Sequence, residues 1–274
     1  MSYPQRVPGG ALSAGAERLP RIRAREALPP SPAAPQPLAR PMRAMPLTRR
    51  YESMWLTPGG EIDDTTRIAP ATPLFEEAFS ALARGSVLTS DTGPVAIEDV
   101  LPGMRLLTAE GDFQTVTWVG SLVMYPGGQE GAEAPVGLTR ITAEAFGAGR
   151  PLPDLVLGPR ARICLRDARL KRVTGFDAAF VPARAFIDGV SVIEVTPAAP
   201  VTLYHLVLER QSALKVMGLE IESYHPGEGL ADMIDPRMLQ LFEAVFPQLP
   251  GIAGFGPMGH PRLTRFEVEE LLGG

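Results

Sequence analysis

The sequence is poor in cysteine, in lysine and in long apolar runs, and each shortage excludes a class of structure. The single cysteine, Cys164, excludes an intramolecular disulfide and a zinc site built on paired thiolates, but it leaves the redox compartment open. No apolar run approaches the roughly eighteen residues of a membrane span. Only Lys171 and Lys215 are lysines, so arginine carries nearly all the positive charge, as is usual for a GC-rich genome. We therefore expect a protein without a membrane segment.

What is present is enough to form a sizeable core. The chain has 274 residues, 45% of them hydrophobic, which excludes a wholly disordered protein. Its net charge of −5 is unevenly distributed, because residues 1–50 contain nine arginines and two glutamates, a local +7, and the remainder carries −12. An acidic body argues against nucleic-acid binding, unless the basic tail acts alone.

The N-terminal segment, residues 1–49, has the composition of a disordered tail. The first fifty residues hold ten of the 29 prolines and show no apolar periodicity, so they cannot bury enough surface to offset their ordering entropy. The segment also lacks the continuous apolar stretch of a secretory signal. We expect a cytoplasmic protein by default, with leaderless export left open.

The rest of the chain is predicted to be mainly β. Residues 50–77 read as a hairpin that turns at 57–60, followed by the start of a short helix over Leu74–Ala83 that Gly85 would end. From 86 to 224, short β-rich runs alternate with turn residues at roughly ten-residue spacing, which is typical of a sandwich or a pseudo-barrel. In residues 228–274 helices return, with an N-cap at Asp235-Pro236 and a capping box from Thr264 to Glu267.

The β segment, residues 78–227, resembles the Hint (hedgehog/intein) domain family. The order and spacing of several stretches carry this resemblance, which implies a horseshoe-like, pseudo-twofold β fold. The stretches are 84–89, 93–103, 116–120, 157–162, 204–210 and 218–227.

The residues of this sequence depart from the family at its reaction centre. Active members use a cysteine or serine at the start of the module to attack the preceding carbonyl, and a Thr-x-x-His element then polarises and protonates the scissile amide. Here Ala81-Leu82, or in another match Ala78-Phe79, stand for the family's Cys-Phe. Gly158 and Ala161 stand for its hydroxyl residue and its histidine. The chain contains no asparagine, so asparagine cyclisation is excluded as well.

One other residue is a candidate nucleophile. Ser86 follows the unhindered carbonyl of Gly85, where an N–O acyl shift would begin, although a structural Gly-Ser turn explains the pair as well. Cys164 lies in an apolar run and has the pattern of a buried structural thiol. The spacing of His205, His225 and His260 matches no common metal motif, so we expect no metal and no cofactor.

Two hypotheses of different classes follow. The first is a non-catalytic Hint scaffold or interaction module with an unknown protein partner and no small-molecule substrate. The second is residual self-cleavage at Ser86, which would release residues 1–85. A weaker third is binding of nucleic acid or an anionic surface by the tail, which predicts salt-sensitive binding that is lost on deletion of residues 1–50. The apolar stripe from Met238 to Phe246 is expected to pack on the β body, with a partner-binding helix as the alternative.

Overall fold

A computed structural model describes residues 47–126 and 137–273. The predicted disordered tail lies outside these residues, apart from its last three positions. The first strand, β1 (Thr48–Leu56), begins two residues before the expected boundary at residue 50. The described residues belong to one compact unit.

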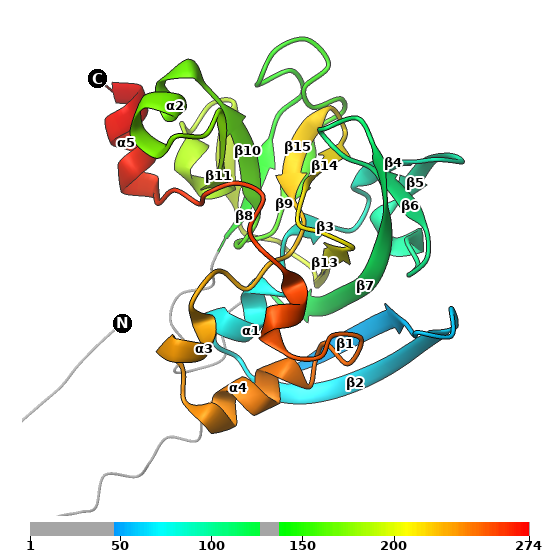
Figure 1. The fold of residues 1–274 in the computed structure, drawn as a ribbon. Coiled ribbons are helices and arrows are strands. Elements are labelled where there is room, and N and C mark those ends of the chain that lie inside the picture. The colour runs from blue at the N-terminus through cyan, green and yellow to red at the C-terminus, as the bar shows by residue number, and fades with distance from the viewer. Residues whose placement is uncertain (1–46, 127–136, 274) are drawn as a thin grey trace, which may run out of the picture. The chain divides into compact units, whose positions relative to one another are not determined.

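The predicted hairpin is confirmed. The strands β1 and β2 (Ile62–Pro70) pair antiparallel, with Ser53 opposite Thr65. On its other side β1 pairs with the long strand β7 (Phe113–Met124), where Trp55 lies opposite Trp118. The hairpin is therefore built into the sheet of the main body, as Figure 1 shows.

The body is an antiparallel array of short strands that cross over repeatedly, which confirms the mainly β fold. Along the main path the order is β11-β10-β15-β14-β4-β6-β7-β13-β3-β9-β8-β12, and β1, β2 and β5 lie off that path. The remaining strands are β3 (Leu82–Ala83), β4 (Val87–Ser90), β5 (Gly93–Ala96), β6 (Arg105–Leu107), β8 (Leu138–Ile141), β9 (Leu155–Leu157), β10 (Arg162–Arg166), β11 (Ala178–Pro182), β12 (Val192–Val195), β13 (Val201–Leu208), β14 (Ala213–Val216) and β15 (Leu219–Glu222).

The helices are short, as predicted. Asp235 caps α4 by accepting a hydrogen bond from the Arg237 amide at 2.8 Å, and Thr264 and Glu267 form the expected capping box before α5. The α-helices are α1 (Pro73–Glu77), α2 (Ala168–Thr174), α3 (Leu230–Met233), α4 (Pro236–Glu243) and α5 (Arg265–Gly273), and the 3-10 helices are η1 (Ile97–Asp99), η2 (Ala183–Phe186) and η3 (Ile252–Phe255). No helix of the described residues is long and apolar enough to cross a membrane.

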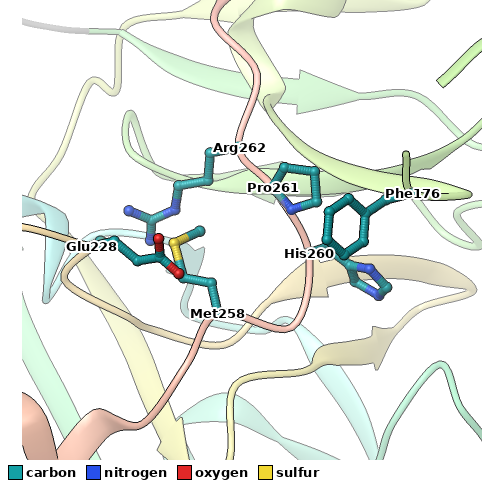
Figure 2. Close-up of a pocket in the computed structure, with 7 residues that line it drawn as sticks. Phe176, Glu228, Met258, His260, Pro261 and Arg262 are labelled. Carbon is teal, nitrogen blue, oxygen red and sulfur yellow. The ribbon is translucent and has the colours of Figure 1, made fainter. Parts of the chain in front are cut away.

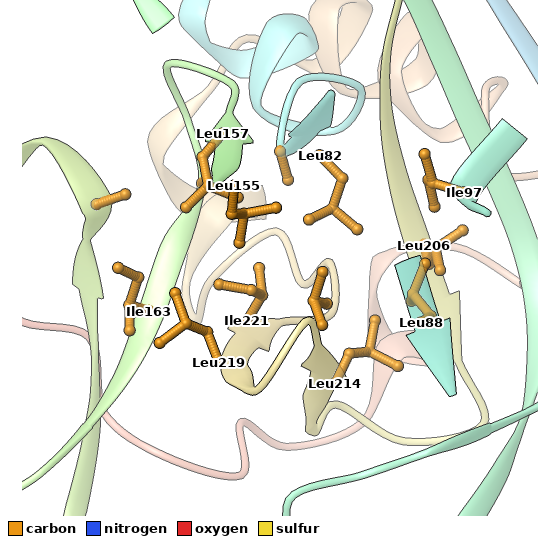
Figure 3. Close-up of a cluster of buried hydrophobic side chains, with 14 of the residues drawn as sticks. Leu82, Leu88, Ile97, Leu155, Leu157, Ile163, Leu206, Leu214, Leu219 and Ile221 are labelled. Carbon is orange, nitrogen blue, oxygen red and sulfur yellow. The ribbon is translucent and has the colours of Figure 1, made fainter. Parts of the chain in front are cut away.

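Two large hydrophobic cores and a small third cluster around Phe180 lie in the described residues. The first is aliphatic and fills the interior of the β body, with Leu82 of β3, Leu206 of β13 and Ile221 of β15 among its members (Figure 3). All three side chains are almost completely buried. Since these strands lie far apart in sequence, this core fixes the crossover topology.

The second core is aromatic and joins the described segments that precede and follow the β body. Tyr51 of β1, Phe75 of α1, Trp118 of β7 and Phe246 after α4 belong to it. Phe242 of α4 contacts Phe75 edge-to-face, with ring centroids 5.6 Å apart. The segments before and after the β body therefore share one core. The stripe around α4 packs on the body, as expected.

Two local expectations are wrong for identifiable reasons. The helix predicted over Leu74–Ala83 ends at Glu77, because the Ala81 amide bonds to Tyr204 O at 3.0 Å and β3 pairs with β13. The sequence favours two separate runs, 115–119 and 122–125, but they form one strand, β7, because Gly120 pairs with Ser53 of β1 and with His205 of β13. A glycine is needed there, since a Cβ would lie 2.0 Å from the Trp118 indole. The strands β8, β11 and β14 and the helix α2 had no clear pattern in the sequence.

Candidate functional site

The turn that contains Ser86 is tightly hydrogen-bonded. Gly85 has a φ of +88°, which favours glycine, and its amide donates to Glu98 Oε2 at 2.9 Å. The Ser86 hydroxyl is buried and donates to Ala83 O at 2.7 Å. Partial burial works against ionisation of Glu98, but the Gly85 amide and Arg84 hold its pKa below its usual value. Ser86 thus occupies a structural turn, and its hydroxyl proton is directed at a carbonyl that precedes the Gly85–Ser86 bond.

The structure brings together the positions that correspond to the family's reaction centre. The Gly158 amide donates to Ala81 O at 2.7 Å, and the Arg160 amide donates to Ser80 O at 3.3 Å. Ala81 and Ala161 are both buried. Since Ala78 lies at the C-cap of α1, this geometry favours Ala81-Leu82 over Ala78-Phe79 as the start of the module.

Backbone packing leaves no room for a side chain at position 158. A Cβ on Gly158 would lie 2.2 Å from Ser80 O and 2.7 Å from the Ser80 carbonyl carbon. Because backbone atoms form this contact, no side-chain rotation relieves it. A serine or threonine hydroxyl therefore does not fit here with the present backbone. The Arg160 amide thus faces the carbonyl of the Ser80–Ala81 peptide, and the Gly158 amide faces the carbonyl of the next peptide, Ala81–Leu82.

A buried ion cluster lies beside this centre. The Glu222 side chain is 1% exposed, and its Oε1 accepts from Arg262 Nε at 2.9 Å. Its Oε2 lies 3.5 Å from Arg162. Arg162 and Arg262 both also contact Glu77 Oε1, the latter at 3.3 Å. Two arginines and two carboxylates thus link α1, β10, β15 and the segment before α5.

Burial and neighbouring charges act in opposite directions in this cluster. Burial raises the pKa of Glu222, although Arg262 and Arg162 oppose the rise. Burial also works against ionisation of Glu77, but the same two arginines bring its pKa below the usual value. The less buried Glu77 is therefore the more firmly ionised of the two. Such a cluster is stable only while all four charges stay together.

His205 stands between this cluster and the aromatic core. Its Nδ1 lies 2.8 Å from Glu77 O and its Nε2 lies 3.3 Å from Glu222 O, and the ring contacts Tyr224 edge-to-face. Burial lowers its pKa to about 4, although both carbonyls favour the charged form. A neutral imidazole has one N–H, so it donates to one carbonyl only, and the shorter contact to Glu77 O is the natural choice.

This histidine predicts an acid-dependent stability. The unfolded chain takes up the proton near pH 6.5, whereas the folded protein takes it up only near pH 4. The contribution of the neutral His205 to the free energy of unfolding is therefore fully present above pH 6.5. It is lost as the pH falls toward 4, and the total loss is about 3 kcal/mol. Urea unfolding at pH 7.5 and pH 4.5 measures the loss. His205→Gln keeps a donor without this titration and should lose less over the same range. Equal losses in both proteins would contradict the prediction.

The remaining histidines and the cysteine have structural settings. His225 Nε2 lies 3.0 Å from Gly256 O, and its Nδ1 accepts from the Gly227 amide at 3.0 Å, so both ring nitrogens are engaged. His260 packs edge-to-face on Phe180. Burial raises the pKa of the Cys164 thiol to about 12, which leaves it protonated and unreactive at neutral pH. Within the described residues no three His, Cys, Asp or Glu side chains are grouped to hold a metal ion.

A surface pocket of about 440 Å³ borders the ion cluster. Figure 2 shows Phe176 and His260 at one end and Glu228, Met258 and Arg262 toward the other. Arg262 is the member that the pocket shares with the cluster. A second pocket of about 320 Å³ lies over β1, β2 and β7. Neither pocket contains Ser86 or a position of the reaction centre.

Sequence reasoning missed the ion cluster. Glu220 and Glu222 alternate with apolar residues in β15, and no pattern distinguishes the fully buried one from its neighbour. Arg162 is the last residue of the stretch 157–162 that resembles the family, which gave a weak signal. Arg262 lies among prolines and glycines, where the sequence suggested only a loop.

Comparison with known proteins identifies the β body. A family model described as the Hint domain matches residues 80–228, more than half of the chain. A bacterial intein-like domain from Clostridium thermocellum is similar over 53% of this chain and 99% of that domain, at 14% identity and a TM-score of 0.37. The MchDnaB-1 intein is similar over 53% of this chain and 100% of its own, at 14% identity and a TM-score of 0.34. A search of curated proteins gave no match.

Proposed function

Because the chain belongs to the Hint domain family, we propose that it uses the Hint fold as a non-catalytic scaffold for interaction with a protein partner. The observation that carries the proposal is the closed reaction centre. Ala81 has no nucleophilic atom, Ala161 has no proton to transfer, and Gly158 lies against the Ser80 carbonyl with no room for a hydroxyl. Autoprocessing needs a nucleophile beside the bond and a group that handles the amide proton.

The integration of the flanking segments also supports a scaffold. Residues before the module pair with β7 through β1, and the Trp118 indole donates to Val245 O at 2.8 Å. A cut at the Gly85–Ser86 bond would leave residues 47–85 held by this strand pairing and by the aromatic core. The fold is therefore suited to keeping both segments in place.

The competing hypothesis is the acyl shift at Ser86. For that reaction the hydroxyl would have to leave Ala83 O and attack the Gly85 carbonyl, and a base would have to accept its proton. Glu98 is the nearby carboxylate, and its lowered pKa makes it a weak base. These contacts favour a structural role for Ser86.

Intact-mass spectrometry of the full-length protein tests the proposal. We expect one species of 29.4 kDa that persists at neutral pH with and without hydroxylamine or dithiothreitol. We also expect Ala81→Cys to remain uncleaved, because the histidine and hydroxyl positions stay empty. A fragment that begins at Ser86 and disappears in Ser86→Ala would overturn the scaffold proposal and establish self-cleavage.

A further inference from the structure

The outer strand of the N-terminal hairpin has a free edge. Within the described residues β2 pairs with β1 alone, and it lies on the side of β1 away from β7 (Figure 1). Two large apolar side chains on it are exposed, Ile62 by 47% and Ile68 by 76%. A nine-residue strand with an uncovered edge is a template for another strand.

The register of the hairpin determines which backbone groups face outward. The Ala71 amide bonds to Leu47 O at 2.7 Å, and at the other end the Thr57 amide bonds to Glu61 O at 2.8 Å. Hydrogen-bonded and non-hydrogen-bonded residue pairs alternate along an antiparallel ladder. The bonds at both ends of the hairpin therefore indicate that the N–H and C=O groups of the odd-numbered residues of β2 point toward β1. The N–H and C=O groups that point to the free edge belong to Ile62, Asp64, Thr66 and Ile68.

We propose that this edge pairs with the same edge of a second copy of the chain, antiparallel and centred on Thr65. In that register Ile62 lies opposite Ile68 of the other copy, and Asp63 lies opposite its Arg67. Both pairs occur twice by symmetry. All the outward backbone groups then bond across the interface, giving about eight hydrogen bonds. Asp63 and Arg67 are both exposed and available for these ion pairs.

The neighbouring registers are worse. The outward backbone groups belong to even-numbered residues, so hydrogen bonds form across the interface only where even-numbered residues of the two copies lie opposite each other. The two nearest alternative registers are therefore centred on Asp64 or on Thr66. The first places two aspartates opposite each other at the axis, which is repulsive. The second places Asp63 opposite Ala69 and leaves its charge without a partner. The sequence of β2 is therefore complementary to itself in one register.

Two local features fit this arrangement. In the single copy the Asp64 amide donates a hydrogen bond to Asp63 Oδ1 at 2.9 Å. In the dimer the same amide would donate to a backbone carbonyl of the second copy instead. Pro70 has no amide to offer to the edge, and it lies just beyond the paired stretch. The interface thus ends where the strand loses its donor.

Charge exchange tests the register in the full-length protein. Sedimentation velocity should show a dimer that dissociates on dilution, with a dissociation constant raised about tenfold in Asp63→Arg and in Arg67→Asp, where attractive pairs become repulsive. An equimolar mixture of the two variants should recover the affinity. In the mixed dimer the two introduced charges face each other with opposite signs, and the unchanged Arg67 of one copy faces the unchanged Asp63 of the other. Arg184→Asp, a charge change of the same size at another exposed arginine, should leave the dimer unchanged.

Cross-linking gives an independent measure. Thr65 faces its own copy across the axis in a non-bonded pair, so Thr65→Cys should form an intermolecular disulfide under mild oxidation. Thr66→Cys, one residue away, faces Asp64 and should cross-link much less. A monomer at all concentrations, equal cross-linking of the two cysteines, or no recovery in the mixture would overturn the proposal. The result is independent of self-cleavage, because β2 precedes the Hint module.

Discussion

Replacing Trp118 by alanine should lower the free energy of unfolding by about 4 kcal/mol, which is the usual cost of removing a buried tryptophan. The indole is fully buried, and its ring lies 5.2 Å from Phe79 and 4.7 Å from Phe246, measured between centroids. Its Nε1 also donates to Val245 O, which would be left without that donor. Urea unfolding followed by circular dichroism measures the change.

The effect should extend to both ends of the described unit. Trp118 lies between the segment that precedes the Hint module and the segment that follows it, so its removal loosens the attachment of each. Hydrogen exchange should therefore accelerate in β1 and α4 before it does in the aliphatic core. Trp55→Ala is the matched control, since Trp55 is only half-buried and should cost far less. Equal losses for the two variants would show that the aromatic core does not join the ends.

Local signals in the sequence predicted the parts of the fold that local chemistry controls. The turn at 57–60 gave the hairpin, Asp235-Pro236 gave the start of α4, and Thr264 with Glu267 gave the cap of α5. Each of these depends on residues within a few positions of one another. Such features can be predicted without knowledge of the tertiary structure.

Features that depend on distant partners could not be predicted in this way. Leu82 and Ala83 follow a helical pattern, yet they form β3 because they pair with β13 and β9. Gly120 resembles a strand break, but a Cβ there would lie 2.7 Å from the distant Phe79 ring, which packs over this position together with Trp118. In both cases a tertiary contact overrides the local preference.

The candidate site shows the same division. The resemblance to the Hint family placed either Ala81 or Ala78 in one reaction centre with Gly158, and in the structure the Gly158 amide bonds to Ala81 O. It did not indicate that the Ser80 carbonyl occupies the space of a side chain at 158. Both that contact and the ion cluster depend on how distant segments of the chain pack together, which the spacing of residues in the sequence does not reveal.

The cluster leads to the second large prediction, for Arg262→Ala. Its guanidinium contacts Glu222 and Glu77 and donates to His225 O at 2.6 Å, so the substitution leaves a buried carboxylate short of charge and donors. Breaking a buried pair by removing one partner costs about 3 to 5 kcal/mol, and we expect a loss in this range at neutral pH. Arg265→Ala is the matched control, because Arg265 forms an exposed i,i+4 pair with Glu269 and should cost less than about 0.5 kcal/mol.

The loss should depend on pH in a direction that identifies Glu222 as its cause. Burial already raises the pKa of Glu222, and removing Arg262 takes away the charge that most opposes this rise. A carboxyl whose folded pKa is raised binds its proton more tightly in the folded state, so its contribution to stability is present at low pH and is lost as the pH rises through that pKa. The difference between Arg262→Ala and the unmodified protein should therefore be smaller at pH 4 than at pH 8. If the difference were the same at both, the loss would come from the hydrogen bond to His225 O and from packing, and Glu222 would not depend on Arg262 for its charge.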